Sequence, residues 1–445
     1  MARKVFISVL GTGFYGSCQY SKDEFTSDNT RFIQKATLEY IGASGWSKDS
    51  AAYIMLTPSA RKINWEEPAN GIRQNRILDK DEEYHGLKTE IDSLSLPFSI
   101  EDVSIPNGKN EDEMWKIFET LYDKIEDEDE LYIDLTHSFR YIPMLVMVFS
   151  NYVKFLKHAK VVHISYGNYE ERDENNIAPI IDLLPLSALQ DWTAAADQYL
   201  TSGNVEKLNA LYLPILKSRL RDTRGRDQDA TMLRGFLVHF DNLIKDRLTC
   251  QGKKIIESKE LCQVIKDLQT LKSIPIPKPF KPILEEISKS LSDFDVNANV
   301  TNGFRAAQWS FDNGLYQQSV TLLQETIVCY VCSCENLDWS NLTIRETVSS
   351  AFAIASMNIP ENNWILRGNT DDEKVSNKEL INRLIANKQL LTLKDNYAYL
   401  SEIRNQYNHA GMLAEAKFSS KVMIDKVKEI LKRIDDKIST PCSSI

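Results

Sequence analysis

An arginine and a histidine near the end of the chain, Arg404 and His409, are separated by four residues in the run Arg-Asn-Gln-Tyr-Asn-His. The guanidinium group of arginine stays charged at physiological pH, whereas the imidazole of histidine titrates near neutrality. A histidine that takes a proton from a ribose 2′-hydroxyl and an arginine that stabilises negative charge on phosphorus are together sufficient to cleave RNA without a metal ion. The same spacing also arises by chance on solvated helix faces, so a second motif is needed before the pair predicts a site.

Hydroxyl, imidazole and guanidinium groups gather in a second run, Asp134-Leu-Thr-His-Ser-Phe-Arg. The run follows a strand predicted at Leu131–Leu135 and precedes a helix predicted at Tyr141–Lys157. This position suits binding of a phosphodiester or of an adenine edge by the polar residues of the run, which are Thr136, His137, Ser138 and Arg140. The alternative is that Thr136 and Ser138 only cap the helix that follows.

A glycine-rich loop follows the first predicted strand, Lys4–Leu10, and matches the pattern G-x-G-x-x-G. Glycines allow close backbone approach to a ligand, and free amides hold phosphate groups. The residues expected to contribute are Gly11, Thr12, Gly13, Phe14 and Tyr15. A dinucleotide oxidoreductase is disfavoured, because the next strand ends at Leu56-Thr57 without an acidic residue for a ribose hydroxyl.

Composition limits the classes of partner. The net charge of −10 repels nucleic acid, so any contact with RNA must be local, and stable DNA binding is not expected. The seven cysteines are few and unevenly spaced, which favours a reducing, cytoplasmic compartment over a disulfide framework. Cys329, Cys332 and Cys334 lack a fourth ligand nearby, and no apolar run is long enough to span a membrane. We therefore expect no metal, no cofactor and no membrane contact.

Hydrophobic periodicity divides the chain into two parts. Residues 1–185 alternate strand and helix, with a helix predicted at Glu83–Leu94, which indicates a Rossmann-like α/β domain with a mostly parallel sheet. Ligands of such sheets bind beyond the carboxyl ends of the strands, where both polar loops are expected. Residues 186–445 show almost only helical patterns, including one at Tyr397–His409, so an all-α second part is predicted.

The combination of motifs resembles one family of proteins. Leu10 to Gly13, Leu56 to Ala60 and above all Asp134 to Arg140 resemble the CARF domain of CRISPR-associated proteins, in the subfamily named for a D-x-T-H-G motif. Ser138 stands where that motif has glycine. The helical remainder resembles a HEPN nuclease domain, whose signature matches Arg404, Asn405 and His409, and Gln317 to Thr326 resembles the helix that precedes the catalytic one.

The resemblance implies an allosteric single-stranded RNA endoribonuclease of type III CRISPR defence. Its activator is a cyclic oligoadenylate, tetra- or hexa-adenylate, bound across a dimer of CARF domains by the two polar loops and Thr57. Residues five apart on a helix lie about 140° apart around its axis, so Arg404 and His409 do not share a face. We therefore expect a homodimer or higher homo-oligomer in which two chains complete each nuclease site, with Asn405 orienting the phosphate or the histidine.

Two other functions remain open. A HEPN toxin-like RNase without second-messenger control would use Arg404 and His409 but leave residues 134–140 without a role. A CARF sensor with an inactive effector domain would do the reverse. The hydroxyl-rich loop is also a candidate for slow cleavage of the activator itself.

Overall fold

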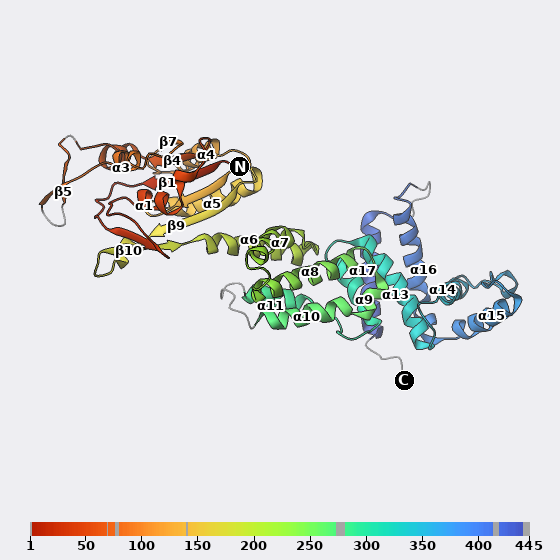
Figure 1. Ribbon diagram of the computed structural model, residues 1–445. Coiled ribbons are helices and arrows are strands. Elements are labelled where there is room, and N and C mark those ends of the chain that lie inside the picture. The colour runs from red at the N-terminus through yellow and green to blue at the C-terminus, as the bar shows by residue number, and fades with distance from the viewer. Residues whose placement is uncertain are drawn as a thin grey trace. The chain divides into compact units, whose positions relative to one another are not determined.

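The computed structural model describes all residues except 1, 69, 76–79, 139–140, 273–280, 413–417 and 439–445. The chain forms two compact units, Met1–Gln190 and Asp191–Ile445, and the boundary between them falls within one helix. Strands occur in the first unit, coloured red to yellow, whereas the second unit, coloured green to blue, is drawn as helices (Figure 1). A mostly parallel α/β sheet followed by a helical region is thus confirmed.

An eight-stranded sheet organises the first unit, in the order β3-β2-β10-β9-β8-β1-β4-β7. The five neighbours from β9 to β7 pair in parallel, and β10 joins β9 in the antiparallel direction. A separate antiparallel hairpin consists of β5 and β6. The strands are β1 Lys4–Leu10, β2 Gln19–Lys22, β3 Phe25–Thr26, β4 Ala51–Leu56, β5 Ile72–Asn75, β6 Lys80–Glu83, β7 Ser99–Ser104, β8 Glu130–Asp134, β9 Lys160–Gly167 and β10 Ile177–Asp182.

Helices cover both faces of this sheet because β1 is apolar on both sides. Val5, Ile7 and Val9 belong to one buried cluster with α4 (Glu111–Lys124) and α5 (Ile142–Leu156). The intervening Phe6 and Leu10 belong to another with α1 (Ile33–Tyr40) and α3 (Leu87–Asp92). A strand whose alternate residues are apolar on both faces must lie in the middle of a three-layer fold.

The helix predicted at Glu83–Leu94 is wrong in its first turn. Glu83 ends β6, and the backbone N–H of Tyr84 still donates to the carbonyl of Gly71 at 2.9 Å. The helix α3 begins at Leu87, after Gly86, where an added Cβ would lie 2.4 Å from the carbonyl oxygen of Trp65. Pairing with a distant strand therefore overrides the local helical pattern.

The order in which strands are added to the sheet switches from one side of β1 to the other between β7 and β8. From β1 the sheet continues through β4 and β7 on one side, whereas β8 and β9 lie on the other. The loops that leave the carboxyl ends of β1 and β8 are consequently neighbours. This is the place where open α/β sheets bind their ligands.

The second unit is built from helices, and one of its buried clusters surrounds the helix that contains Arg404. The buried side chains come mainly from α12, α13, α14, α16 and α17. The helix α16 begins after the capping residue Asn387, well before the predicted start at Tyr397, and α9 was not predicted. The helices are α6 Leu184–Ser202, α7 Glu206–Asp222, α8 Gln228–Leu248, α9 Gly252–Glu257, α10 Lys259–Leu271, α11 Lys281–Ser290, α12 Thr301–Asp312, α13 Tyr316–Cys334, α14 Leu342–Met357, α15 Asp371–Ile385, α16 Lys388–Asn408 and α17 Ser420–Ile438.

Two further observations bear on the expected partners. Across the described residues, no helix is both long and apolar enough to cross a membrane, and no three potential metal ligands of the His, Cys, Asp or Glu types cluster together. Five cysteines are free thiols, whereas Cys334 is disulfide-bonded. The sequence predicted no disulfide framework, so this disulfide was not expected.

Candidate functional site

The neighbouring carboxyl ends of β1 and β8 are organised by the buried carboxylate of Asp134. Its oxygens accept hydrogen bonds from the Ser8 hydroxyl at 2.7 Å and from the Thr136 hydroxyl at 2.6 Å. Burial raises the pKa of Asp134, and the bonds from Thr136 and Ser8 oppose that shift. Ser8 is the register partner of Asp134 on the neighbouring strand, so this carboxylate joins β1 to the loop that follows β8.

Thr136 holds the loop in shape through its hydroxyl. This group donates to Asp134 and also accepts from the backbone N–H of Gly167 at 2.8 Å. The alternative of helix capping by Thr136 and Ser138 is wrong, because α5 begins after Tyr141 without a side-chain cap. Within the described part of the chain, the buried hydroxyl of Ser138 has no hydrogen-bond partner. Its hydrogen-bonding capacity is therefore not used by the described residues.

An aromatic stack connects the two loops. The rings of His137 and Tyr15 lie with their centroids 3.6 Å apart and their planes 7° apart. Burial lowers the pKa of His137 to about 3, so its imidazole is neutral at pH 7. Its Nδ1 is buried without a partner among the described residues. The two loops predicted to bind one ligand thus meet directly through these rings.

The glycine-rich loop is held in place by hydrogen bonds from Asn64. The side-chain amide of Asn64 donates to the carbonyls of Gly11 at 2.8 Å and Gly13 at 2.9 Å. Burial raises the pKa of Tyr15, and the backbone amides of Gly11 and Gly13 oppose that shift. These two amides already face the phenolic oxygen of Tyr15. A phosphate must therefore replace that oxygen or use the other amides of the loop.

Two arginines supply positive charge beside this loop. The guanidinium groups of Arg31 and Arg73 each lie 5.2 Å from the centre of the Phe14 ring. Arg31 also donates to the carbonyl of Tyr15 at 3.0 Å and pairs with Glu82 at 2.9 Å. Sequence patterns did not identify Arg31, which lies outside both motifs, and left Arg73 open as part of either an ordinary loop or a lid over the ligand at residues 64–84.

The other predicted ligand residues differ in where they are found. Thr57 is 4% exposed, and its hydroxyl accepts from the backbone N–H of Ala60 at 3.2 Å, where it caps the short helix α2 (Pro58–Ala60). Arg140 lies outside the described residues. Thr12 and Gly13 are exposed and Phe14 and Tyr15 are partly buried, as a loop at the edge of a crevice requires.

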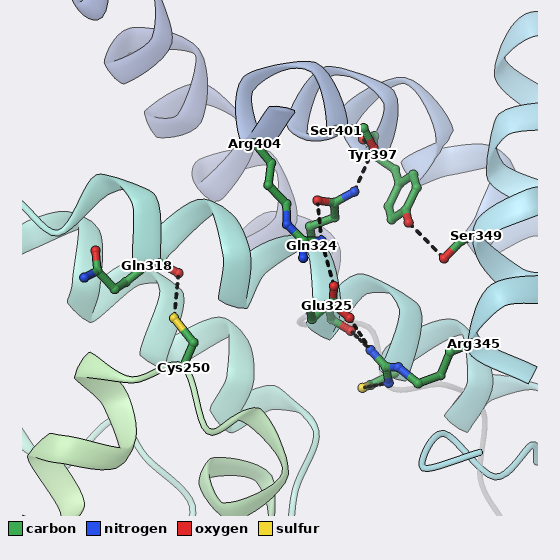
Figure 2. Close-up of polar contacts among 10 residues, drawn as sticks. Cys250, Gln318, Gln324, Glu325, Arg345, Ser349, Tyr397, Ser401 and Arg404 are labelled. Atoms are coloured by element: carbon green, nitrogen blue, oxygen red, sulfur yellow. Dashed lines mark hydrogen bonds and ion pairs between the residues drawn. The ribbon is translucent and has the colours of Figure 1, made fainter. Parts of the chain in front are cut away.

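The nuclease candidates lie near the end of α16. Nη1 of Arg404 donates to Oε1 of Glu325 at 2.8 Å and to the side-chain oxygen of Gln324 at 3.2 Å. Figure 2 shows Glu325 between Arg404 and Arg345, whose Nη2 lies 2.5 Å from Oε2 of Glu325. One carboxylate thus binds two guanidinium groups, and it fixes the direction of Arg404.

Contacts to α13 and α14 hold the same face of α16 along three successive turns. Tyr397 donates to Ser349 of α14 at 3.0 Å. The side-chain NH2 of Gln324 donates to Ser401 at 2.7 Å, while its oxygen accepts from Arg404. These contacts are visible together in Figure 2. Arg404 is the last member of a line of side chains whose positions are all determined by hydrogen bonds.

Asn405 and His409 are both exposed. His409 is the residue at which α16 ends, and its backbone N–H donates to the carbonyl of Asn405 at 3.1 Å. The helical spacing behind the two-chain prediction therefore extends to His409. The residues that sequence reasoning missed are Glu325 and Arg345; Glu325 lies within the run resembling the helix that precedes the catalytic one, but no spacing rule connects it to Arg404.

The sheet order and its covering helices define the first unit as a Rossmann-like domain, with the polar loops after β1 and β8 at the carboxyl edge of its sheet. Residues 5–171 match the family described as the CARF domain of the CRISPR system endoribonuclease Csx1. The chain is also 27% identical over 237 residues to the CRISPR-associated protein MJ1674 of Methanocaldococcus jannaschii, a match that covers 52% of this chain and 34% of the relative. The chain thus spans about a third of the length of the curated relative it matches. Together the two matches support a CRISPR-associated protein with an N-terminal CARF domain.

Proposed function

We propose that this protein is a cyclic oligoadenylate-activated, metal-independent endoribonuclease that cleaves single-stranded RNA in type III CRISPR defence. The observation that carries the proposal is the guanidinium of Arg404, fixed by Glu325 in the last turns of α16, together with the exposed His409 that follows the last residue of the same helix. This pair occurs in a chain whose first unit matches the CARF domain of a CRISPR endoribonuclease.

The chemistry follows from the two side chains. His409 takes the proton of a ribose 2′-hydroxyl, whose oxygen then attacks the adjacent phosphorus. The bond from phosphorus to the 5′-oxygen breaks, and that oxygen takes a proton back from the same histidine. Arg404 stabilises the charge that develops on the non-bridging oxygens. The products are a 2′,3′-cyclic phosphate and a free 5′-hydroxyl.

Two chains are needed for each nuclease site in this proposal. Arg404 and His409 lie about 140° apart around α16, if its turns are regular. A two-fold axis near the end of α16 brings Arg404 and Asn405 of one chain toward His409 of the other. We therefore propose a homodimer as the minimal active unit.

We propose that the activator binds beside the two loops that follow the carboxyl ends of β1 and β8. A cyclic oligoadenylate has one negative charge per phosphate, and Arg31 and Arg73 supply local positive charge beside Phe14. The buried Ser138 hydroxyl and His137 Nδ1, which have no partner among the described residues, offer hydrogen bonds to an adenine edge. A neutral His137 suits this role, because a neutral imidazole can bind the ligand without the cost of burying a charge.

Purified protein tests the proposal with labelled single-stranded RNA, with and without cyclic tetra- and hexa-adenylate, in the presence of EDTA. We expect cleavage only with one of the activators, and 2′,3′-cyclic phosphate ends. Strict dependence on magnesium contradicts the mechanism. Cleavage that ignores the activators indicates a HEPN RNase without messenger control, and activator binding without any cleavage indicates a sensor with an inactive effector.

A further inference from the structure

A cavity of about 420 Å³ lies in the second unit, and Glu325, the carboxylate that binds Arg404, is one of its lining residues. Its walls come from α9, from α13, from the segment that precedes α14 and from Arg345 in the first turn of α14. This volume is in the range of cavities that bind small molecules. Neither nuclease residue lines the cavity, so the site described above does not account for it.

The cavity is fixed in position relative to Arg404. Glu325 lines it and is bonded through one oxygen to Arg345, another lining residue, and through the other oxygen to Arg404. The charge of Arg404 also acts on Cys250, another lining residue. Burial raises the pKa of the Cys250 thiol, and the charge of Arg404 opposes that shift. A single carboxylate group therefore separates the cavity from the guanidinium assigned to the scissile phosphate.

The charged groups of the cavity suit an anionic ligand. The lining contains two cations, Lys253 and Arg345, and one carboxylate, Glu325, which Arg404 also binds. The side chain of Lys253 is 65% exposed, and its Nζ lies as far as 4.0 Å from Oε1 of Glu257. Lys259 is closer to the same carboxylate, at 3.1 Å. The lining cations thus outnumber the lining carboxylates in a chain of net charge −10, while the carboxylate of Asp338, whose pKa is lowered by hydrogen bonds from Ser340 and by the charge of Lys253, lies next to the lining.

The remaining lining groups suit a nucleobase. Trp339 offers a partly buried indole, and Thr321 and Ser340 offer hydroxyl groups. The hydroxyl of Ser340 already donates to Asp338 at 2.6 Å, which leaves its oxygen as an acceptor. Proteins recognise single-stranded RNA by stacking a base on an aromatic side chain, by hydrogen bonds to its edges and by cations at the phosphates.

We propose that this cavity binds one nucleotide of the RNA substrate, next to the phosphate that Arg404 contacts. Trp339 stacks on the base, and Lys253 binds the adjoining phosphate. The inference depends on the proposed nuclease function and adds a substrate subsite to it. A base held there places the neighbouring phosphodiester at Arg404, because the two are separated only by Glu325.

Binding is measured on full-length protein with the His409→Ala substitution, which allows RNA to be held without cleavage. The probes are a fluorescent single-stranded oligoribonucleotide and versions with one abasic position moved along the chain, each in the presence of the activator. Trp339→Ala should weaken binding of the intact RNA by roughly 5- to 150-fold, the usual effect of one base–aromatic stack. Trp339→Phe, which keeps an aromatic plane, should weaken it by less than roughly threefold.

Two comparisons separate stacking from general damage. One abasic position should weaken binding to the parent protein but not to Trp339→Ala, because the same stack is lost in either case. Lys253→Ala should reduce the slope of log affinity against log salt by about 0.7, the value for one phosphate of a single strand. Lys266→Ala removes an exposed lysine of α10 and serves as the control.

The proposal is overturned if Trp339→Ala and Lys253→Ala bind every oligonucleotide as the parent does while wild-type protein cleaves RNA. Thermal melting of each variant checks folding, because Trp339 packs against the core and its carbonyl accepts from Arg345 at 2.9 Å. If Trp339→Ala does not fold, Trp339→Phe with the abasic series and Lys253→Ala decide the question. Absence of both binding and cleavage by wild-type protein instead overturns the nuclease function itself.

Discussion

Replacing His137 by phenylalanine tests whether the stack on Tyr15 requires a neutral ring. Burial lowers the pKa of His137 from 6.5 to about 3. The unfolded chain therefore takes up this proton first as the pH falls, and the folded state loses stability relative to it. The loss begins below pH 6.5 and continues toward pH 3. Phenylalanine keeps an aromatic ring against Tyr15 but has no proton to take up.

The size of the effect follows from the shift. A pH of about 5 lies roughly 1.5 units below the pKa of this histidine in the unfolded chain, and each unit corresponds to about 1.4 kcal/mol. His137 should therefore lower the free energy of unfolding by about 2 kcal/mol between pH 7.5 and pH 5. His163, whose pKa burial lowers to about 4, adds a loss of similar size that the variant retains.

Urea unfolding at pH 7.5 and pH 5, followed by circular dichroism, measures the difference. Wild-type protein should lose about 2 kcal/mol more than His137→Phe between the two pH values. His85→Asn provides the control, since the side chain of His85 is 53% exposed in the same unit. Equal losses for wild-type protein and His137→Phe would refute the argument that burial keeps this imidazole neutral.

Three further outcomes concern the two sites. Gly11→Ala should raise the activator concentration needed for cleavage at least tenfold, because the added Cβ would lie 2.7 Å from the Tyr15 hydroxyl and 2.9 Å from the carbonyl oxygen of His137; isothermal titration measures the affinity, and an unchanged curve places the ligand elsewhere. His409→Ala should slow cleavage by roughly 10²- to 10⁴-fold without changing the melting temperature, since the residue is exposed. Mixing Arg404→Ala chains with His409→Ala chains should restore part of the activity in proportion to heterodimer formation; no restoration in a mixed dimer would argue against a shared site.

The fold was predictable where local patterns and long-range packing agree. The apolar β1 and the helical pattern around Arg404 lead to the observed sheet and helix because burial enforces both. The helix expected from Glu83 was wrong because pairing with β5 takes that residue into a strand. Local periodicity contains no information on such pairing.

The candidate sites were predictable only in part, for the same reason. His137 was found from its motif, but its stacking on Tyr15 depends on the neighbouring ends of β1 and β8, which the strand order alone decides. Glu325 is 79 residues from Arg404, and an acidic residue on a helix is usually a solvated one. Thr57 was assigned to the ligand because it resembles a motif, whereas its position before Pro58 also makes it a helix cap.

The hydrogen bonds along α16 limit how the two units can communicate. Tyr397, Ser401 and Arg404 recur at every turn of one face, and each meets a partner on α13 or α14. A displacement of α16 by a fraction of a turn would break all three contacts at once, which disfavours a small sliding movement of this helix. Under the proposed activation, His409, which follows the last residue of α16, is the nuclease candidate that can change position while these three contacts stay intact.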